Sequence, residues 1–159
     1  METSERFTAP DPNFEARVRA SFSEQAVMAT LGVEIVGLGP GWIDLTFDRD
    51  ERFTQQHGYV HAGVIATVLD SACGYAAFSL MPADAAVLTV EFKVNLLRPA
   101  NQNGYLVSGM VLKPGRTLTI CQATAVPSEG GEPMAVMTGT LMSLVGDGDR
   151  ELTVGGKGP

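Results

Sequence analysis

One aspartate stands in the middle of an apolar segment, and this placement needs an explanation. The segment from Gly58 to Ala77 reads GYVHAGVIATVLDSACGYAA, with Asp70 as its one carboxylate. Burying an ionised carboxylate without a partner costs several kcal/mol, so Asp70 either hydrogen-bonds to neighbouring groups or takes part in chemistry. If Asp70 takes part in chemistry, it would be a general base or a nucleophile whose pKa is tuned by partial burial.

The residues one helical turn away from Asp70 are all small. They are Ala66, Thr67, Cys73 and Gly74. Positions three and four apart lie on the same face of a helix, so these side chains leave a channel beside the carboxylate.

The triplet His61-Ala62-Gly63 supplies a complementary group at the expected start of the same helix. The first backbone N–H groups of a helix have no partner within the helix, and the helix dipole is positive at that end. Gly63 also lets another group approach its N–H closely. We therefore predict that the Gly63 N–H forms an oxyanion hole.

His61 and Asp70 are 9 positions apart. At about 100° and 1.5 Å per residue they point to opposite sides of the helix, separated by roughly 13 Å along its axis. The two groups cannot meet in one chain. If both serve one reaction, a symmetric dimer must bring each helix start to the middle of the partner's helix, which predicts two composite sites per dimer.

The helix that carries these groups is expected to begin near His61 to Gly63 and to end before Met81 and Pro82. It is apolar on nearly all sides, so other parts of the protein must surround it. The next segment, AAVLTVEFKVNLLRPA, alternates as a half-covered strand does. One face is predicted to carry Leu88, Val90, Phe92, Val94 and Leu96, and the other Thr89, Glu91, Lys93 and Asn95.

The remaining patterns complete an α+β domain. NFEARVRASFSEQAVMATL predicts one surface helix, and turn signals separate strands expected over residues 33–38, 42–47, 104–112, 117–126 and 133–144. We expect a curved antiparallel sheet wrapped around the long central helix. The predicted organisation is an N-terminal helical segment over residues 1–30, one domain over 31–146 and a disordered tail over 147–159.

Composition excludes several classes of function. The net charge of -7, without a basic stripe, argues against a nucleic-acid partner. The sequence has no apolar run long enough to cross a membrane and no signal-peptide pattern at its start, which predicts a cytoplasmic protein without a membrane partner. Cys73 and Cys121 are expected to be small buried hydrophobes. Two histidines and scattered acids predict no metal site, and no cofactor is expected.

Gln55, followed after five residues by His61-Ala62-Gly63 and then by Asp70, forms a pattern together with the strand VEFKVNLLRPA and the turn PGR. This pattern resembles the hotdog-fold acyl-CoA thioesterases of the phenylacetate-degradation (PaaI-like) group, over about residues 30 to 145. The resemblance implies a hotdog fold, in which a sheet wraps a helix. It also implies hydrolysis of an acyl-CoA thioester without a cofactor.

The resemblance further implies roles for individual residues. Asp70 would be the catalytic carboxylate, the Gly63 N–H would polarise the thioester carbonyl, His61 would shape the helix start, and Gln55 would bind the thioester or water. The usual triplet of the family is His-Gly-Gly, whereas Ala62 holds the middle position here. Ala62 is expected to contact the substrate.

Binding of the CoA moiety predicts further residues. Its phosphates need cations, and Arg98, Lys113 and Arg116 lie at predicted strand ends, with Asn95 on the polar side of its strand. A solvated surface charge explains each basic residue equally well. The acyl pocket should be apolar, and Tyr59, Val60, Phe78 and Met81 are candidates to line it, although ordinary core packing also explains them.

The leading hypothesis is therefore an acyl-CoA thioesterase that forms a homodimer, or a dimer of dimers. A hotdog dehydratase or hydratase would need a catalytic histidine paired with an acid, which fits Asp70, Gly63 and Gln55 less well. A non-catalytic acyl-CoA sensor is the alternative from another class of function. The sequence leaves the acyl group open, and it leaves open whether Asp70 activates water or attacks covalently.

Overall fold

The structure, a computed structural model, describes residues 6–146, so the predicted tail over residues 147–159 lies outside the described residues. The elements are the helices α1 (Phe14–Glu24), α2 (Ala26–Leu31) and α3 (Ala62–Phe78), the short 3-10 helix η1 (Glu51–Phe53), and the strands β1 (Glu34–Gly39), β2 (Trp42–Asp48), β3 (Ala85–Leu96), β4 (Gly104–Lys113), β5 (Leu118–Pro127) and β6 (Ala135–Val145). The predicted strands are confirmed to within about two residues at their ends.

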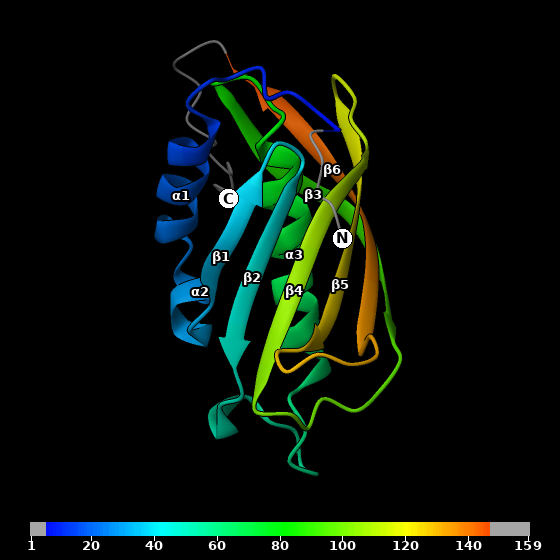
Figure 1. Ribbon diagram of the computed structural model, residues 1–159. Helices are drawn as coiled ribbons and strands as arrows, with labels where there is room; N and C mark the ends of the chain where they lie inside the picture. The colour runs from blue at the N-terminus through cyan, green and yellow to red at the C-terminus, as the bar shows by residue number, and fades with distance from the viewer. Residues whose placement is uncertain (1–5, 147–159) are drawn as a thin grey trace, which may run out of the picture.

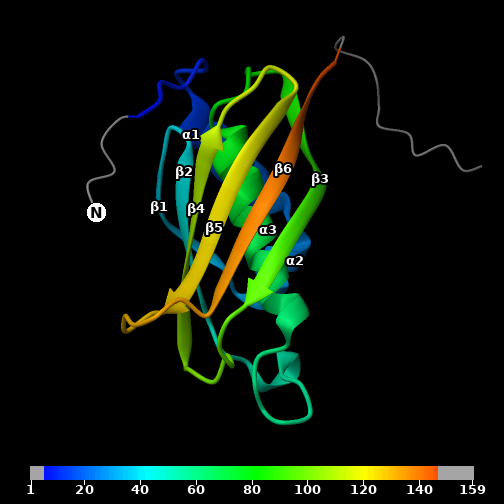
Figure 2. The ribbon, with the colours of Figure 1, turned by 90° about the vertical axis from the view of Figure 1, so that its right-hand side faces the viewer.

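The strands form one antiparallel sheet in the order β1-β2-β4-β5-β6-β3. Figures 1 and 2 show this sheet curving around α3, so the predicted arrangement of a sheet wrapped around a central helix is confirmed. β3 follows α3 in sequence but pairs only with β6, at one end of the sheet. β1 and β3 are therefore the two edge strands.

The central helix α3 is buried on most of its surface, as an all-apolar helix must be. Gly109 lets β4 approach α3 closely, because a Cβ atom at this position would lie 2.5 Å from the carbonyl oxygen of Ala72. No helix within residues 6–146 has the length and apolar character needed to cross a membrane.

The N-terminal segment differs from the prediction of one continuous helix. α1 ends at Glu24, Gln25 adopts an extended conformation with ψ of 93°, and α2 then begins at Ala26. The side chain of Gln25 accepts a hydrogen bond of 2.9 Å from the hydroxyl of Ser71 on α3. The break places Gln25 against α3, and both short helices still bury an apolar residue, Val18 on α1 and Met28 on α2.

The prediction of strict alternation along β3 is wrong, because the pairing with β6 shifts between Thr89 and Glu91. Val90 is the extra residue of this bulge. The alternation of inward-facing and outward-facing side chains therefore shifts by one position across it. Thr89 pairs with the fully buried Leu141, so Thr89 faces α3. Beyond the bulge Phe92, like Thr89, faces the helix, since it pairs with Gly139, next to Cys73 of α3.

Candidate active site

His61 forms the N-cap of α3 and fixes the first turn of this helix. Its Nδ1 accepts a hydrogen bond of 2.9 Å from the N–H of Gly63, and its carbonyl oxygen accepts from the N–H of Val64 at 2.9 Å. The N–H group that we predicted as the oxyanion donor is therefore already engaged within the chain. A side chain that caps a helix satisfies a donor that would otherwise need a ligand or water.

Ala62 carries the remaining open donor at this helix end. The hydrogen bonds of residues 6–146 include none from its N–H group. Ala62 is the first residue of α3, where the dipole of the helix favours negative charge. The structure thus shifts the candidate for polarising a carbonyl from Gly63 to Ala62.

A tight turn before α3 holds Gln55. The N–H of Gln55 donates to the carbonyl oxygen of Tyr59 at 2.8 Å, and the N–H of Gly58 donates to the carbonyl oxygen of Gln55 at 2.9 Å. Thr54 and Val60 form an isolated antiparallel bridge that closes the turn. The side-chain oxygen Oε1 of Gln55 accepts from the N–H of His57, so the amide nitrogen Nε2 is left as its donor toward a ligand.

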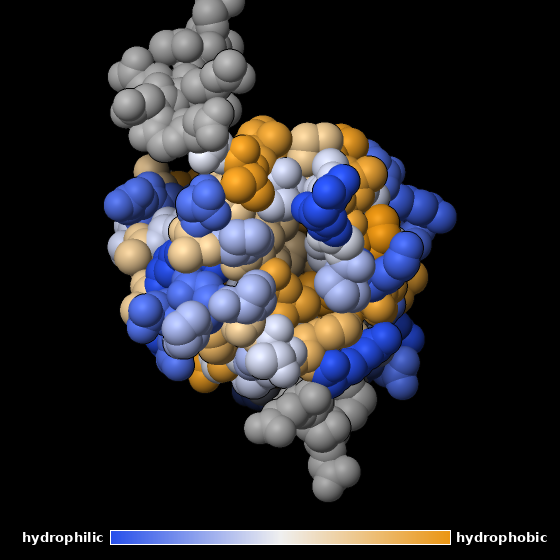
Figure 3. Space-filling view, turned by 90° about the horizontal axis from the view of Figure 1, so that it is seen from above, coloured by the Kyte–Doolittle hydropathy of each residue, from blue (hydrophilic) through white to orange (hydrophobic). Residues whose placement is uncertain are grey.

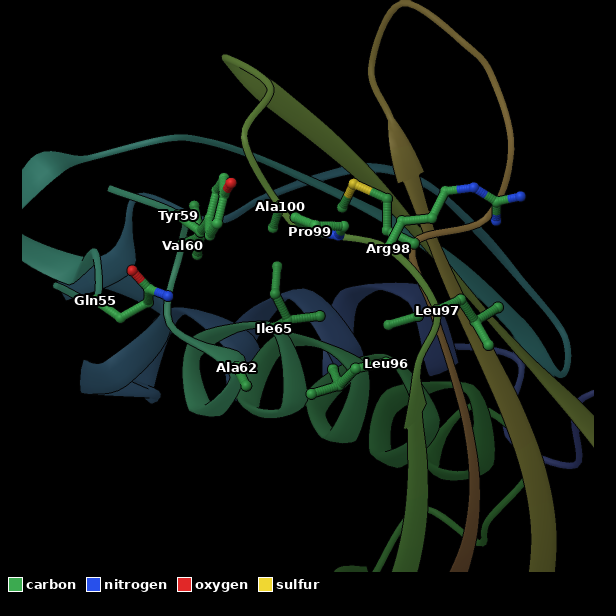
Figure 4. A pocket seen from close by; sticks show the side chains of 12 residues that line it. Gln55, Tyr59, Val60, Ala62, Ile65, Leu96, Leu97, Arg98, Pro99 and Ala100 are labelled. Carbon is green, nitrogen blue, oxygen red and sulfur yellow. The ribbon is translucent and has the colours of Figure 1, made fainter. Parts of the chain in front are cut away.

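A pocket of about 350 Å³ opens at the start of α3, between this turn and the loop that follows β3. Figure 4 shows Gln55 and Tyr59 at one end and Arg98 at the other. The lining is mostly apolar and consists of Gln55, Tyr59, Val60, Ala62, Ile65, Leu96, Leu97, Arg98, Pro99, Ala100, Met134 and Ala135. Tyr59 and Val60, which we predicted as lining residues, are among them. Phe78 and Met81 are not, because they lie at the other end of α3.

Asp70 is half-buried and lies outside this pocket. Its Oδ1 accepts a hydrogen bond of 2.8 Å from the hydroxyl of Thr89 on the edge strand β3. Burial raises the pKa of Asp70 above its ordinary value, and the Thr89 hydrogen bond opposes this shift. The carboxylate therefore has the hydrogen-bond partner that a purely structural role requires. Its raised pKa and partial exposure are also those of a candidate base.

The structure shows open space at one of the positions predicted to form a channel beside Asp70. A Cβ atom at Gly74 would meet no atom within 4 Å. Thr67 turns its hydroxyl to the carbonyl oxygen of Gly63 at 2.7 Å, away from the carboxylate. This side of α3 is only half covered by its own chain.

Ala62 and Asp70 do not face a common point within one chain. They are eight residues apart on α3, which corresponds to about 12 Å of helix. A polarised carbonyl and the water or carboxylate that attacks it must lie about 3 to 3.5 Å apart. One protomer therefore presents the two halves of a site separately.

The predicted CoA-binding residues do not come together either. Arg98 lines the pocket, but its guanidinium donates to the carbonyl oxygen of Pro133 at 2.7 Å and to Glu132 at 3.3 Å. Lys113 ends β4, and Arg116 lies in the turn after it, whereas the Arg98 loop precedes the start of β4. The two groups thus occupy opposite ends of the sheet.

The end of the molecule that carries the turn between β4 and β5 is seen from above in Figure 3. Hydrophilic residues there surround smaller hydrophobic areas.

Asn95, the other predicted binding residue, is exposed and pairs with Val136 on the outer face of the sheet.

Both cysteines are free and buried, as predicted. Burial raises the pKa of the Cys73 thiol far above its ordinary value and that of Cys121 to about 12. Neither thiol is therefore a candidate nucleophile, because the reactive species is the thiolate.

Sequence reasoning missed two residues near the site. Thr89 was assigned to the polar outer face, because nothing in its neighbours marks the bulge at Val90. Arg49, which follows β2, was not considered, although its Nη2 donates to the carbonyl oxygen of Gly58 at 3.0 Å. A pattern of hydrophobic residues carries no signal for either contact.

Comparisons with known proteins bear directly on this arrangement. The sequence profile of the Thioesterase superfamily matches residues 57–134, a range that includes the helix start and Asp70. The crystal structure of a thioesterase family protein from Silicibacter pomeroyi is 54% identical, covers 84% of this chain and 99% of its own, and superposes with a TM-score of 0.81. The chain belongs to the thioesterase superfamily. It is a thioester hydrolase, as predicted.

More distant structures share the fold of this thioesterase. The PaaI protein of the phenylacetic acid degradation operon of E. coli is 18% identical, with a TM-score of 0.77 over 83% of this chain and 94% of its own. A thioesterase from Haemophilus influenzae is 22% identical, with a TM-score of 0.73 over 79% of this chain and 87% of its own. The predicted hotdog fold and the PaaI-like resemblance are confirmed.

Proposed function

We propose that this thioesterase hydrolyses acyl-CoA and that each active site is built from two copies of the chain. The observation that carries the proposal is the division of the site along α3. Ala62 offers an open N–H to an apolar pocket, and Asp70 stands half-buried beside the edge strand eight residues later. Antiparallel association of two copies supplies each pocket with the carboxylate that its own helix does not bring there.

The edge strand β3 is the proposed contact between the copies. Its exposed apolar side chains include Val90, Phe92 and Leu96, which are 51%, 45% and 53% exposed. A long apolar edge strand without a partner is a site where another strand pairs. Pairing two β3 strands antiparallel continues the sheet and brings Asp70 and Thr89 of the partner subunit toward this chain's pocket. Association into a dimer of dimers and the cytoplasmic location remain predictions from the sequence.

In the proposed mechanism the thioester carbonyl lies at the start of α3. Its oxygen accepts a hydrogen bond from the Ala62 N–H, and the positive end of the helix dipole stabilises the charge that develops there. Gln55 donates from Nε2 to the thioester or to the attacking water. His61 holds the first turn in place by occupying the Gly63 N–H.

The carboxylate of Asp70 acts on the opposite side of the carbonyl. As a general base it removes a proton from water while the water oxygen attacks the carbonyl carbon. The tetrahedral intermediate then expels the CoA thiolate, which takes up a proton, and the products are a carboxylic acid and free CoA. As a nucleophile, Asp70 would instead attack the carbonyl carbon, expel the CoA thiolate and form an anhydride that water cleaves afterwards. A single turnover in ¹⁸O-labelled water separates general-base attack from a nucleophilic route in which water cleaves the anhydride at the Asp70 carbonyl. The first route places the label in the carboxylic acid product, and the second places it in the Asp70 carboxylate.

The CoA phosphates require cations from both copies in this arrangement. Arg98 lies at the mouth of the pocket. Antiparallel pairing of the β3 strands reverses the second copy, so that Lys113 and Arg116 of the partner subunit approach the end of the sheet where Arg98 lies. The apolar pocket then receives the acyl group, next to Tyr59 and Val60.

Release of free thiol from a panel of aryl, medium-chain and branched acyl-CoAs tests the proposal. The wild-type chain is expected to release thiol from at least one substrate class, and Asp70→Asn to lose at least about a hundredfold in kcat. Because Cys73 and Cys121 are buried with raised pKa values, the protein adds no reactive thiol to this readout. Binding of acyl-CoA without any thiol release would instead identify a sensor.

A further inference from the structure

We propose that Arg49 is a positioning residue that holds Gln55 at the pocket by clamping the turn between Gln55 and Tyr59. This inference rests on the proposed function, since it assigns Arg49 a part in placing the substrate. Arg49 does not line the pocket itself and acts through the backbone of the turn.

The contacts of Arg49 join the end of β2 to two loops. Its backbone N–H donates to the carbonyl oxygen of Asn103 at 2.7 Å, and its Nη2 donates to the carbonyl oxygen of Gly58 at 3.0 Å. Gly58 has a φ of +81° and donates its own N–H to the carbonyl oxygen of Gln55. A single residue of the turn therefore connects the guanidinium to the backbone of Gln55.

The stability of the fold alone does not account for an arginine at this position. None of the ion pairs within residues 6–146 includes Arg49, and its Nε is buried without a hydrogen-bond partner. A partly buried charge without a counter-ion costs free energy that an apolar side chain of similar size avoids. What the guanidinium supplies in return is its hydrogen bond to the carbonyl oxygen of Gly58.

The turn held in this way places the polar side chain of Gln55 at a mostly apolar pocket. Gln55 and Arg98 are the only lining residues with polar side-chain groups besides the hydroxyl of Tyr59, and the Arg98 guanidinium already bonds to Pro133 and Glu132. In Figure 4 the Gln55 amide turns its nitrogen toward the pocket. Surface turns move more than the elements they connect, and a displacement of about 1 Å at a reacting group can cost about a hundredfold in rate.

A double-mutant cycle tests the coupling between Arg49 and Gln55. Arg49→Met is expected to lower kcat/KM about tenfold and Gln55→Ala by at least as much, while the double variant is no worse than Gln55→Ala alone. Arg49→Lys, which keeps the positive charge and can still donate a hydrogen bond, is expected to recover part of the loss. The matched control is Arg52→Met, because Arg52 is exposed in the same segment and its guanidinium hydrogen-bonds to Asp50 and not to the turn that holds Gln55.

Hydrogen exchange of the amides in residues 55–60 provides a readout that does not depend on activity. These amides are expected to exchange at least about tenfold faster in Arg49→Met than in the wild type or in Arg52→Met. If Arg49→Met does not fold, Arg49→Lys serves both measurements, with an intermediate loss and intermediate exchange expected.

Three results would overturn the inference. They are wild-type kinetics in Arg49→Met, losses that simply multiply in the double variant, and unchanged exchange in residues 55–60. If the wild-type chain hydrolyses no acyl-CoA, the proposed function fails, but faster exchange in Arg49→Met still supports the clamp and unchanged exchange still refutes it.

Discussion

Thr89 on the edge strand and Asp70 on the central helix share a hydrogen bond of 2.8 Å between the threonine hydroxyl and Oδ1 of the carboxylate. The contact exists because a bulge in β3 turns Thr89 toward the helix. It stabilises the ionised carboxylate, whereas burial favours the protonated form. The pKa of the proposed base is set by these two opposed effects.

Removal of the Thr89 hydroxyl should change the pH dependence of the reaction. As the proposed base, Asp70 acts in its carboxylate form, and without the hydrogen bond its pKa should rise further. Thr89→Val should therefore move the acidic limb of kcat/KM upward by about one pH unit, and Thr89→Ser should leave it near the wild-type position. A profile of Thr89→Val that coincides with that of the wild type would show that the hydroxyl does not tune the base.

The raised pKa of Asp70 also predicts a stability that depends on pH. A carboxyl whose folded-state pKa lies above its unfolded value contributes stability at pH values below the unfolded pKa, and this contribution is lost as the pH rises through the folded pKa. Asp70→Asn has no such loss. In thermal unfolding, Asp70→Asn should have a higher Tm than the wild type at pH 7, and the difference in Tm should be smaller near pH 3.5. A variant less stable than wild type at pH 7 would contradict the assignment.

Removal of the Ala62 N–H should impair catalysis while leaving the helix intact. Proline is favoured at the first position of a helix, and His61 before it has a ψ of 136°, which proline tolerates. Ala62→Pro is expected to lower kcat by about 10²- to 10³-fold without a loss of Tm. Ala62→Ser keeps the N–H and is the control. Activity of Ala62→Pro equal to that of Ala62→Ser would contradict the oxyanion role of the Ala62 N–H.

Charge on the exposed edge of β3 should separate the copies. Phe92→Arg is expected to convert the protein to a monomer in light scattering and to abolish thiol release, because each site then lacks its second half. Leu118→Lys is the control, since Leu118 is 46% exposed but lies on the inner strand β5. An active monomer of Phe92→Arg would contradict a site shared between chains.

The fold was largely predictable because each element has a strong local pattern. The all-apolar stretch with a proline after it defined α3, and turn residues separated the strands of the sheet. The break at Gln25 was missed because it depends on a contact with Ser71 from a distant part of the chain.

The site was predictable only in part. The sequence singled out Asp70 and the helix start, since a carboxylate within an apolar segment has few explanations. It did not reveal that His61 occupies the Gly63 N–H, because the choice of donor depends on a side-chain orientation. It also missed Thr89, since Val90 is an ordinary strand residue and gives no sign of a bulge.

The proposed site combines Ala62 of one chain with Asp70 of another. It is tested most directly by mixing Ala62→Pro and Asp70→Asn subunits under conditions of exchange. Each mixed dimer then holds one site with both groups intact and one with neither, and half of the dimers are mixed at random. The mixture should show about a quarter of the wild-type activity. Activity no higher than that of the two inactive parents, with exchange verified, would contradict the shared site.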